Sequence, residues 1–263
     1  FVKRGDLLAS CGNSGRSPEP HIHFQAQVSP ALGSRTLEYP FAYYHQVERD
    51  GNKLIQFSKP EEGNIVSGVI DNPLLKNAFD IMPNSTFEFK YLNEKEEEIT
   101  EEWEAFTDAY NYKYLYCKET ESSAYYVNDS LMFYFTAFYG SKKSLLYYFY
   151  LTAYKVFLGN PDHILVKDAM PLNIIRNRKL SLWIHDFIAP FYNYIRVLYS
   201  IKIASAPTLS ESGKVVLESE IGVSVFGKLR KESMGSIIIE NNCITGFNYE
   251  SAKTQIHATC INS

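Results

Sequence analysis

The chain has 263 residues, 45% of them hydrophobic and 21% charged, and a formal net charge of −4 at pH 7. This composition is typical of an ordinary globular protein and gives no electrostatic reason to expect nucleic acid as a partner. The length allows one large domain or two smaller ones, each with a core that needs no disulfide support. The 20 Tyr and 17 Phe favour extensive β-sheet with aromatic packing in the core.

Neither the cysteines nor the most apolar segments indicate a special class of protein. The four cysteines form no Cys-x-x-Cys pair and are too scattered for a disulfide scaffold. Residues 145–158 and 180–198 are apolar but short or interrupted by charges, so no transmembrane helix is expected. Because no leader precedes Phe1, and Phe1–Lys3 is typical of the inside of a folded segment, we expect this chain to be part of a longer gene product.

Residues with metal chemistry are concentrated near the start of the sequence, where a Gly-, Asn- and Ser-rich loop leads into the strand-like run His21–Val28. Side chains alternate along a strand, so His21 and His23 should share one face while Ile22 and Phe24 point into a core. Neutral imidazole is a good zinc ligand, and an unligated histidine beside the metal can exchange a proton with zinc-activated water. The pair therefore predicts one metal ligand and one acid–base group.

A His-x-His pair also occurs on many solvent-facing strands that bind no metal, so the neighbouring residues must decide its meaning. A cupin-like site would need a Glu three or four residues beyond the pair, where Gln27 and Val28 stand. A metallo-β-lactamase-like site would need an Asp in place of Gln25. Both of these families are therefore set aside.

The surrounding residues resemble the closing motif of the lysostaphin-type zinc metallopeptidases, the cell-wall endopeptidase family. Three segments carry the resemblance: Val2–Asp6, Gly12–Ser17 and Pro20–Phe24. It implies that residues 1–29 are the C-terminal remnant of a mostly β peptidase domain. It further implies that His23 binds zinc, and that His21 is a catalytic residue that acts as an acid–base group or stabilises the transition state. The family's turns would fall at Gly5, Gly12 and Gly15.

The family's other ligands, a His and an Asp spaced as His-x-x-x-Asp, and a further catalytic His lie upstream of this motif. The present sequence contains no His-x-x-x-Asp. A catalytic zinc usually takes three protein ligands, so we expect the Zn²⁺ site of this chain to be incomplete, to bind zinc poorly and to cleave nothing alone. Four further histidines have no partner at ligand spacing and are expected to be surface or hydrogen-bonded residues: His45, His163, His185 and His257.

For the full-length form, the resemblance implies hydrolysis of peptide crosslinks in bacterial peptidoglycan by zinc-activated water, and therefore a location in the cell envelope. Residues 30–263 resemble regions that follow such peptidase domains in Bacteroidetes-type proteins, where the peptidase can be fused behind a urea-transporter-like membrane domain. Membrane association would then come only through a part N-terminal to this chain. The alternative is a non-catalytic envelope module, in which the peptidase remnant is scaffold and the second domain binds a partner.

After the histidine motif, residues 30–64 combine recurrent Pro and Gly with short apolar runs, which predicts an extended connector that contains the domain boundary. Residues 65–263 predict an aromatic-rich α+β domain of unknown function. Within it, Thr86–Tyr91 alternates as a strand with one buried face, and the acid-rich run Glu94–Glu102 predicts a solvated turn. The strand-like runs that follow should form an antiparallel meander: 103–110, 112–117, 124–127 and 131–138.

Two apolar stripes at helical spacing predict helices over residues 146–157, ending at Gly159, and over residues 180–188, ending before Pro190. Beyond them, two long strands and closing hairpins are indicated by period-two patterns, with a turn at Asn241-Asn242 that tolerates positive φ: 195–203, 215–225, 236–240, 243–249 and 254–261. The expected fold is therefore mainly β: a truncated lysostaphin-like β remnant, followed by an α+β domain of antiparallel sheets with two main helices.

Overall fold

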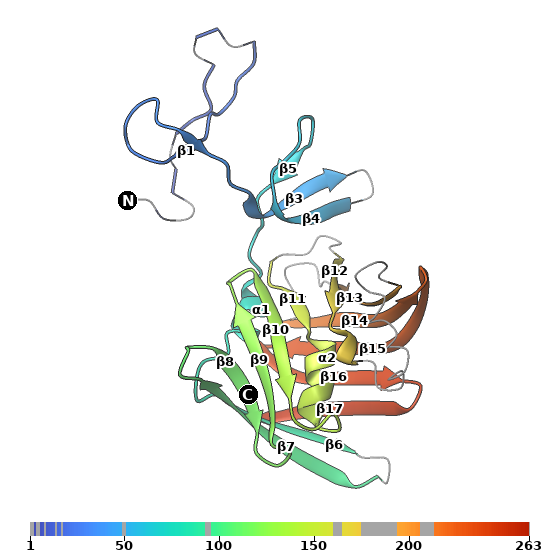
Figure 1. Ribbon diagram of the computed structural model, residues 1–263. Helices are drawn as coiled ribbons and strands as arrows, with labels where there is room; N and C mark the ends of the chain where they lie inside the picture. The colour runs from blue at the N-terminus through green and yellow to red at the C-terminus, as the bar shows by residue number, and fades with distance from the viewer. Residues whose placement is uncertain are drawn as a thin grey trace.

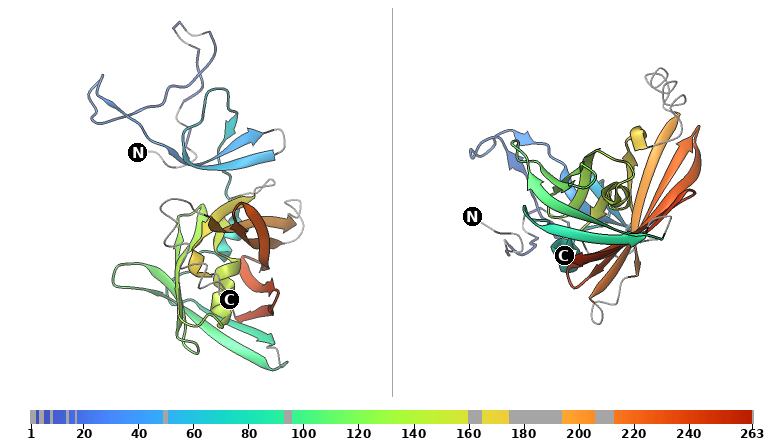
Figure 2. Two further views of the ribbon diagram at one scale, coloured as in Figure 1. Left: turned by 45° about the vertical axis from the view of Figure 1, so that its right-hand side comes forward. Right: turned by 90° about the horizontal axis from the view of Figure 1, so that it is seen from below.

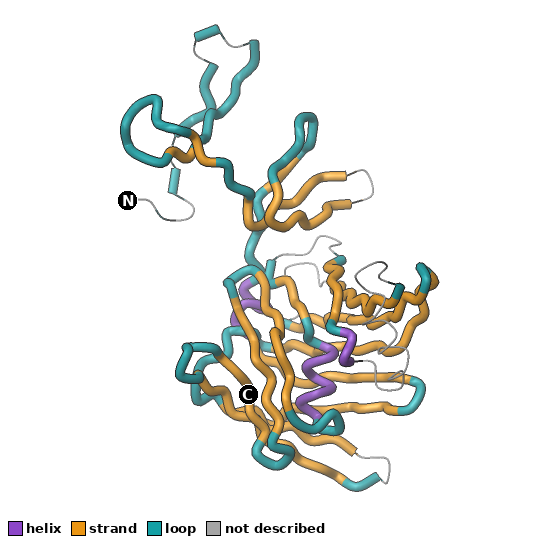
Figure 3. The backbone as a smooth tube through the Cα atoms, in the orientation of Figure 1, coloured by secondary structure: helices purple, strands orange, loops and turns teal. Residues whose placement is uncertain are grey.

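The computed structural model describes residues 3, 6–7, 9–13, 15–16, 18–48, 51–92, 96–159, 165–174, 194–205 and 213–262. Within these residues the chain is mostly β-strand, with two α-helices and one 3-10 helix (Figures 1 and 3). The strands form sheets of two, three and twelve strands, and the paired strands within them run antiparallel. The expectation of a mainly β fold built from antiparallel sheets is confirmed.

Two small sheets precede the large one and lie to one side of it (Figure 1). The pairs are β1 (Ala26–Gln27) with β2 (Thr36–Leu37), and β3 (Phe41–Glu48) with both β4 (Gly51–Ser58) and β5 (Val66–Ser67). The β3–β4 hairpin occupies much of residues 30–64, where the sequence predicted an extended connector. Its prolines and glycines mark strand ends, since Pro40 precedes β3 and Gly51 opens β4. The domain boundaries themselves stay a prediction.

The strand predicted over His21–Val28 is wrong for most of its length, because only Ala26–Gln27 form a strand. Ile22 and Phe24, expected to point into a core, are 75% and 73% exposed. A strand needs a paired neighbour and an apolar layer beneath it, and the buried core of the described residues begins further along the chain, at Val69. The alternating pattern here is therefore not matched by burial.

Twelve strands form one curved sheet in the order β11-β10-β9-β8-β7-β6-β17-β16-β15-β14-β13-β12. This order describes two six-stranded meanders, β6 to β11 and β12 to β17, which join where β17 pairs with β6. The strands are β6 (Thr86–Leu92), β7 (Glu98–Thr107), β8 (Lys113–Cys117), β9 (Ser122–Asn128), β10 (Met132–Tyr139), β11 (Lys155–Phe157), β12 (Val166–Met170), β13 (Ile195–Ser205), β14 (Lys214–Val225), β15 (Lys228–Glu240), β16 (Cys243–Ser251) and β17 (Thr254–Asn262). The helices are α1 (Pro73–Ala78), α2 (Leu145–Thr152) and the 3-10 helix η1 (Leu172–Ile174).

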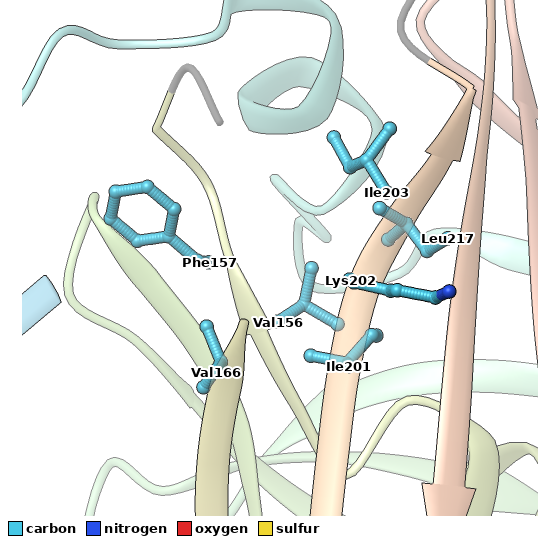
Figure 4. A pocket seen from close by; sticks show the side chains of 7 residues that line it. All are labelled: Val156, Phe157, Val166, Ile201, Lys202, Ile203 and Leu217. Carbon is cyan, nitrogen blue, oxygen red and sulfur yellow. The ribbon is translucent and has the colours of Figure 1, made fainter. Parts of the chain in front are cut away.

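The two edge strands of this sheet, β11 and β12, approach each other, so the sheet curls until it is nearly closed (Figure 2). Lys155 Nζ on β11 lies 2.6 Å from Asp168 Oδ2 on β12, an ion pair that joins the two edges. A small, partly open gap remains at this seam, lined among others by Val156 of β11, Val166 of β12 and Ile201 of β13 (Figure 4). The edges are thus short and covered, which protects them from pairing with other chains.

Most strands after residue 85 lie where the sequence predicted them. The meander β7 to β10 and the long strands β13 and β14 are confirmed, and so are the closing hairpins. Asn241 and Asn242 have φ of 53° and 69°, as the predicted turn requires. The solvated turn predicted over Glu94–Glu102 is wrong for Glu98–Glu102, because these residues belong to β7 and Glu101 is buried.

The helix predicted over residues 146–157 is too long. Helix α2 ends at Thr152, and Lys155–Phe157 form strand β11, whose residues pair with the start of β10. Sheet pairing of this β-prone segment outweighs its helical spacing. Gly159 is accordingly not a helix stop: a Cβ there would lie 2.3 Å from the Phe157 ring, so the residue is small for lack of space. The second predicted helix, over residues 180–188, lies outside the described residues. Helix α1 was not predicted from the sequence.

Helix α2 is buried on every side within the curved sheet, and all eight of its residues are buried. A helix that is apolar all round belongs in an interior rather than on a surface. On one side, two rings of the sheet pack against Phe149: Trp103, tilted, and Phe247, edge to face, each with its centroid 5.3 Å away. The abundance of aromatic residues is thus explained largely by core packing.

The buried carboxylate of Glu101 holds the N-terminus of α2. Its oxygens accept hydrogen bonds from the backbone N–H of Leu145 at 2.8 Å and of Leu146 at 3.3 Å. Two further side chains donate to it, Trp103 Nε1 of the same strand at 3.2 Å and Cys117 Sγ of β8 at 3.5 Å. Burial raises the pKa of Cys117 to about 12, so the thiol keeps its proton and remains a donor. A negative charge at a helix N-terminus is favourable, and these donors offset the cost of burying it.

The C-terminus of α2 is held from the opposite meander. Tyr199 on β13 donates its hydroxyl to the Thr152 carbonyl oxygen at 2.8 Å, and burial raises the pKa of this phenol. Gly235 on β15 makes room for the same turn, because a Cβ there would lie 2.6 Å from the Thr152 side chain. Each meander therefore supplies a polar side chain to one end of the helix.

Replacing Glu101 with Gln should destabilise the fold by about 2–4 kcal/mol, because an amide nitrogen would then face a backbone N–H and leave a buried donor without an acceptor. The matched control is Glu102→Gln at the next, exposed position of β7, which should change stability by less than about 0.5 kcal/mol. Urea unfolding followed by circular dichroism measures both. Equal effects of the two substitutions would show that Glu101 does not anchor α2.

Tyr199→Phe should cost about 1–2 kcal/mol, because it leaves the buried Thr152 carbonyl oxygen without its donor while preserving the ring. Tyr139→Phe serves as the control, because it removes a phenolic hydroxyl from a residue that is 64% exposed. The two variants are compared by thermal unfolding. A loss at Tyr139 as large as that at Tyr199 would contradict the capping role.

Candidate functional site

The structure brings the two motif histidines together without a regular strand. His21 donates its backbone N–H to Gly12 O at 3.3 Å, which ties the motif to the preceding loop. The Nε2 atoms of His21 and His23 lie 2.8 Å apart, and the rings meet edge to face with centroids 4.6 Å apart. Both side chains are exposed. The expected placement on one side is thus achieved by irregular backbone that follows the bridge at His21.

A backbone carbonyl sets the orientation of His21. Its Nδ1 lies 2.9 Å from Glu19 O, and because a carbonyl oxygen can only accept, this nitrogen carries the proton in the neutral ring. The Nε2 of His21 is then an acceptor, and His23 Nε2 donates to it. An Nδ1–H held by a carbonyl is the usual outer contact of a metal-binding imidazole, and it leaves Nε2 available for metal or proton chemistry.

The pair fits part of a zinc site. His23 Nε2 would hold zinc in place of the proton that it shares with His21, and His21 Nε2, 2.8 Å away, would be the neighbouring acid–base group. The pair thus offers one metal ligand and one acid–base group at the surface. Within the described residues, no cluster of three or more His, Cys, Asp or Glu side chains is placed to hold a metal ion. The described part of the chain therefore supplies only part of such a site.

Neither of the other two histidines in the described residues joins the pair. His257 lies on the outer face of β17, exposed and hydrogen-bonded to Asn248 Oδ1 at 2.8 Å, as expected for a surface histidine. His45 is buried in β3, with its ring centroid 6.0 Å from that of Phe157. His163 and His185 lie outside the described residues.

Sequence reasoning missed a second candidate site, a cavity between α2 and the inner face of the large sheet. It has a volume of about 340 Å³ and opens to solvent on one side. Its apolar wall comes from helix α2, the end of η1 and strands β13, β14 and β16: Tyr147, Tyr148, Leu151, Ile174, Val197, Ile221, Val223 and Tyr249. These residues are spread over about a hundred positions of the sequence, so no local motif marks them as one site. The only signal in the sequence is the alternating pattern of each strand, which indicates the side chains of its inner face.

Polar groups line one end of this cavity. Ser233 on β15 pairs with Ser251 on β16, and three charged residues lie beyond that pair at the same end of the sheet: Arg230, Glu232 and Lys253. These three are exposed, whereas the apolar residues of α2, β13, β14 and β16 that form the wall are buried. The cavity therefore has an exposed, charged edge on β15 and the β16–β17 turn and a buried, apolar wall on α2, β13 and β14.

Comparisons with protein-family models, with curated proteins and with solved structures gave no match. The resemblance to lysostaphin-type peptidases therefore rests on the motif of residues 1–29 itself. Among the described residues, no helix has the length and apolar character needed to cross a membrane.

Proposed function

We propose that residues 1–29 are the closing part of a zinc endopeptidase site whose full-length form hydrolyses peptide crosslinks of bacterial peptidoglycan. The observation that supports this is the pair of exposed imidazoles, His21 and His23, whose Nε2 atoms lie 2.8 Å apart beside an orienting carbonyl. Surface exposure suits the proposal, because a polymeric substrate must reach the reacting atoms from solvent.

In this proposal His23 binds the metal through Nε2, and His21 acts on the reacting groups. Bound zinc supplies a Lewis acid and an activated water at neutral pH. The Glu19 carbonyl holds the proton on His21 Nδ1, so Nε2 of the same ring is the atom that takes a proton or, once protonated, donates to the developing oxyanion. The ring is thus oriented before substrate arrives, which lowers the entropy cost of the step.

The proposal requires further ligands, because a catalytic zinc takes about three from the protein. The family that the motif resembles uses a His-x-x-x-Asp segment, which does not occur in this sequence. On its own, the chain should therefore bind Zn²⁺ weakly and hydrolyse nothing. We place the full-length protein in the bacterial cell envelope, where peptidoglycan is found, with any membrane association provided by a part N-terminal to this chain.

The test starts from the coding DNA upstream of Phe1, read in frame for a His-x-x-x-Asp segment, and from the protein that this longer frame encodes. We expect about one zinc per chain and release of new amino groups from purified peptidoglycan. His23→Ala should lower zinc affinity more than about 100-fold. His21→Ala should keep zinc but lower the hydrolysis rate about 10²- to 10⁴-fold.

His257→Ala is the matched control, because it removes an exposed imidazole that lies outside the pair; it should change neither zinc content nor rate. A His23→Ala protein that keeps both its zinc and its activity would refute the proposed role of the motif. So would a full reading frame that lacks other zinc ligands.

A non-catalytic envelope module is the second candidate, and the large folded part of the chain favours it. Twelve of the seventeen strands in the described residues form a nearly closed sheet that has its own core and cavity and contains no part of the histidine pair. Co-sedimentation with insoluble peptidoglycan separates the two functions. Binding by this chain with unchanged strength in the His21→Ala/His23→Ala double variant would support a binding module.

A further inference from the structure

We propose that the cavity between α2 and strands β13–β16 binds a single-chain anionic amphiphile of the fatty-acid class. This site is independent of the histidine pair, so either proposal can fail without the other. Its volume of about 340 Å³ lies within the ~300–1,000 Å³ usual for small-molecule sites and is sufficient for a small elongated ligand.

The wall of the cavity selects an apolar chain. Aliphatic side chains from two neighbouring strands, Val197, Ile221 and Val223, face Leu151 of α2 across it, and all four are buried. The Tyr148 and Tyr249 rings, with centroids 5.0 Å apart, form another part of the wall. Because the helix and sheet are fixed by the core, this wall is preformed and needs little reorganisation on binding.

The mouth of the cavity selects a negative head group. Two of the charged lining residues, Arg230 and Lys253, are cationic and one, Glu232, is anionic, so the lining carries net positive charge in a chain whose formal net charge is −4. A guanidinium binds a carboxylate through two parallel hydrogen bonds, which favours a carboxylate head over a cationic one. Ser251 and Thr254 add hydroxyl groups to the same end.

A carboxylate with one acyl chain fits both features. The chain lies along the apolar wall with its head at Arg230 and Lys253, so that the charged group stays at the solvent-facing end. Burying a charge inside the apolar part would be costly, which fixes this orientation. Fatty acids with longer acyl chains should bind more tightly, by about fourfold for each additional methylene that is buried against the apolar wall.

The test is titration calorimetry of the whole chain with dodecanoate below its micelle concentration. Dodecyltrimethylammonium has the same chain with the opposite charge and should bind at least about tenfold more weakly. The series octanoate, decanoate, dodecanoate tests the apolar wall without any substitution. No saturable dodecanoate binding, equal affinity for the two head groups, or affinity independent of chain length would each overturn the proposal.

Arg230→Gln and Lys253→Gln should each weaken dodecanoate binding about three- to tenfold. Lys231→Gln is the matched control: it removes one positive charge from the adjacent position of β15, where the side chain pairs with Glu220 and lines no part of this cavity. Its dodecanoate affinity should stay within about twofold of the parent. Equal losses at Arg230 and Lys231 would indicate a general charge effect and refute the site.

Discussion

A fully buried helix has polar ends that cannot reach water, and the large sheet of this protein is organised around that constraint. Helix α2 lies inside the curved sheet, so its first N–H groups and last carbonyls need partners from side chains. Glu101 of the first meander accepts from Leu145 and Leu146, and Tyr199 of the second donates to Thr152. The two halves of the sheet are therefore joined through the helix as well as through the β6–β17 pairing and the Lys155–Asp168 ion pair.

The same helix defines the cavity. Because α2 is anchored at both ends, Leu151 and its aromatic neighbours stand at a fixed distance from β13 and β14, and the space between them stays open rather than collapsing. Close packing elsewhere leaves no freedom to fill it, as the contact of Gly235 with Thr152 illustrates. The cavity is thus a consequence of how the helix is held.

The histidine pair depends on none of this. The geometry of His21 and His23 is set within a few residues, by the Gly12 bridge and the Glu19 carbonyl. The chain therefore combines a locally built polar site with a cavity built by tertiary packing. The two proposals concern separate parts of the molecule and different chemistry, zinc-assisted hydrolysis and amphiphile binding.

The sequence by itself determined the strands of the large sheet after residue 85 and the turn at Asn241-Asn242, because period-two patterns and left-handed turn residues act locally. It also placed the two histidines together. Only the tertiary structure decided the rest. Lys155–Phe157 became a strand because β10 offered a partner, and Glu101 entered the core because α2 offered it donors. The cavity could not be foreseen, since its wall comes from residues far apart in the chain that meet only when the sheet curls.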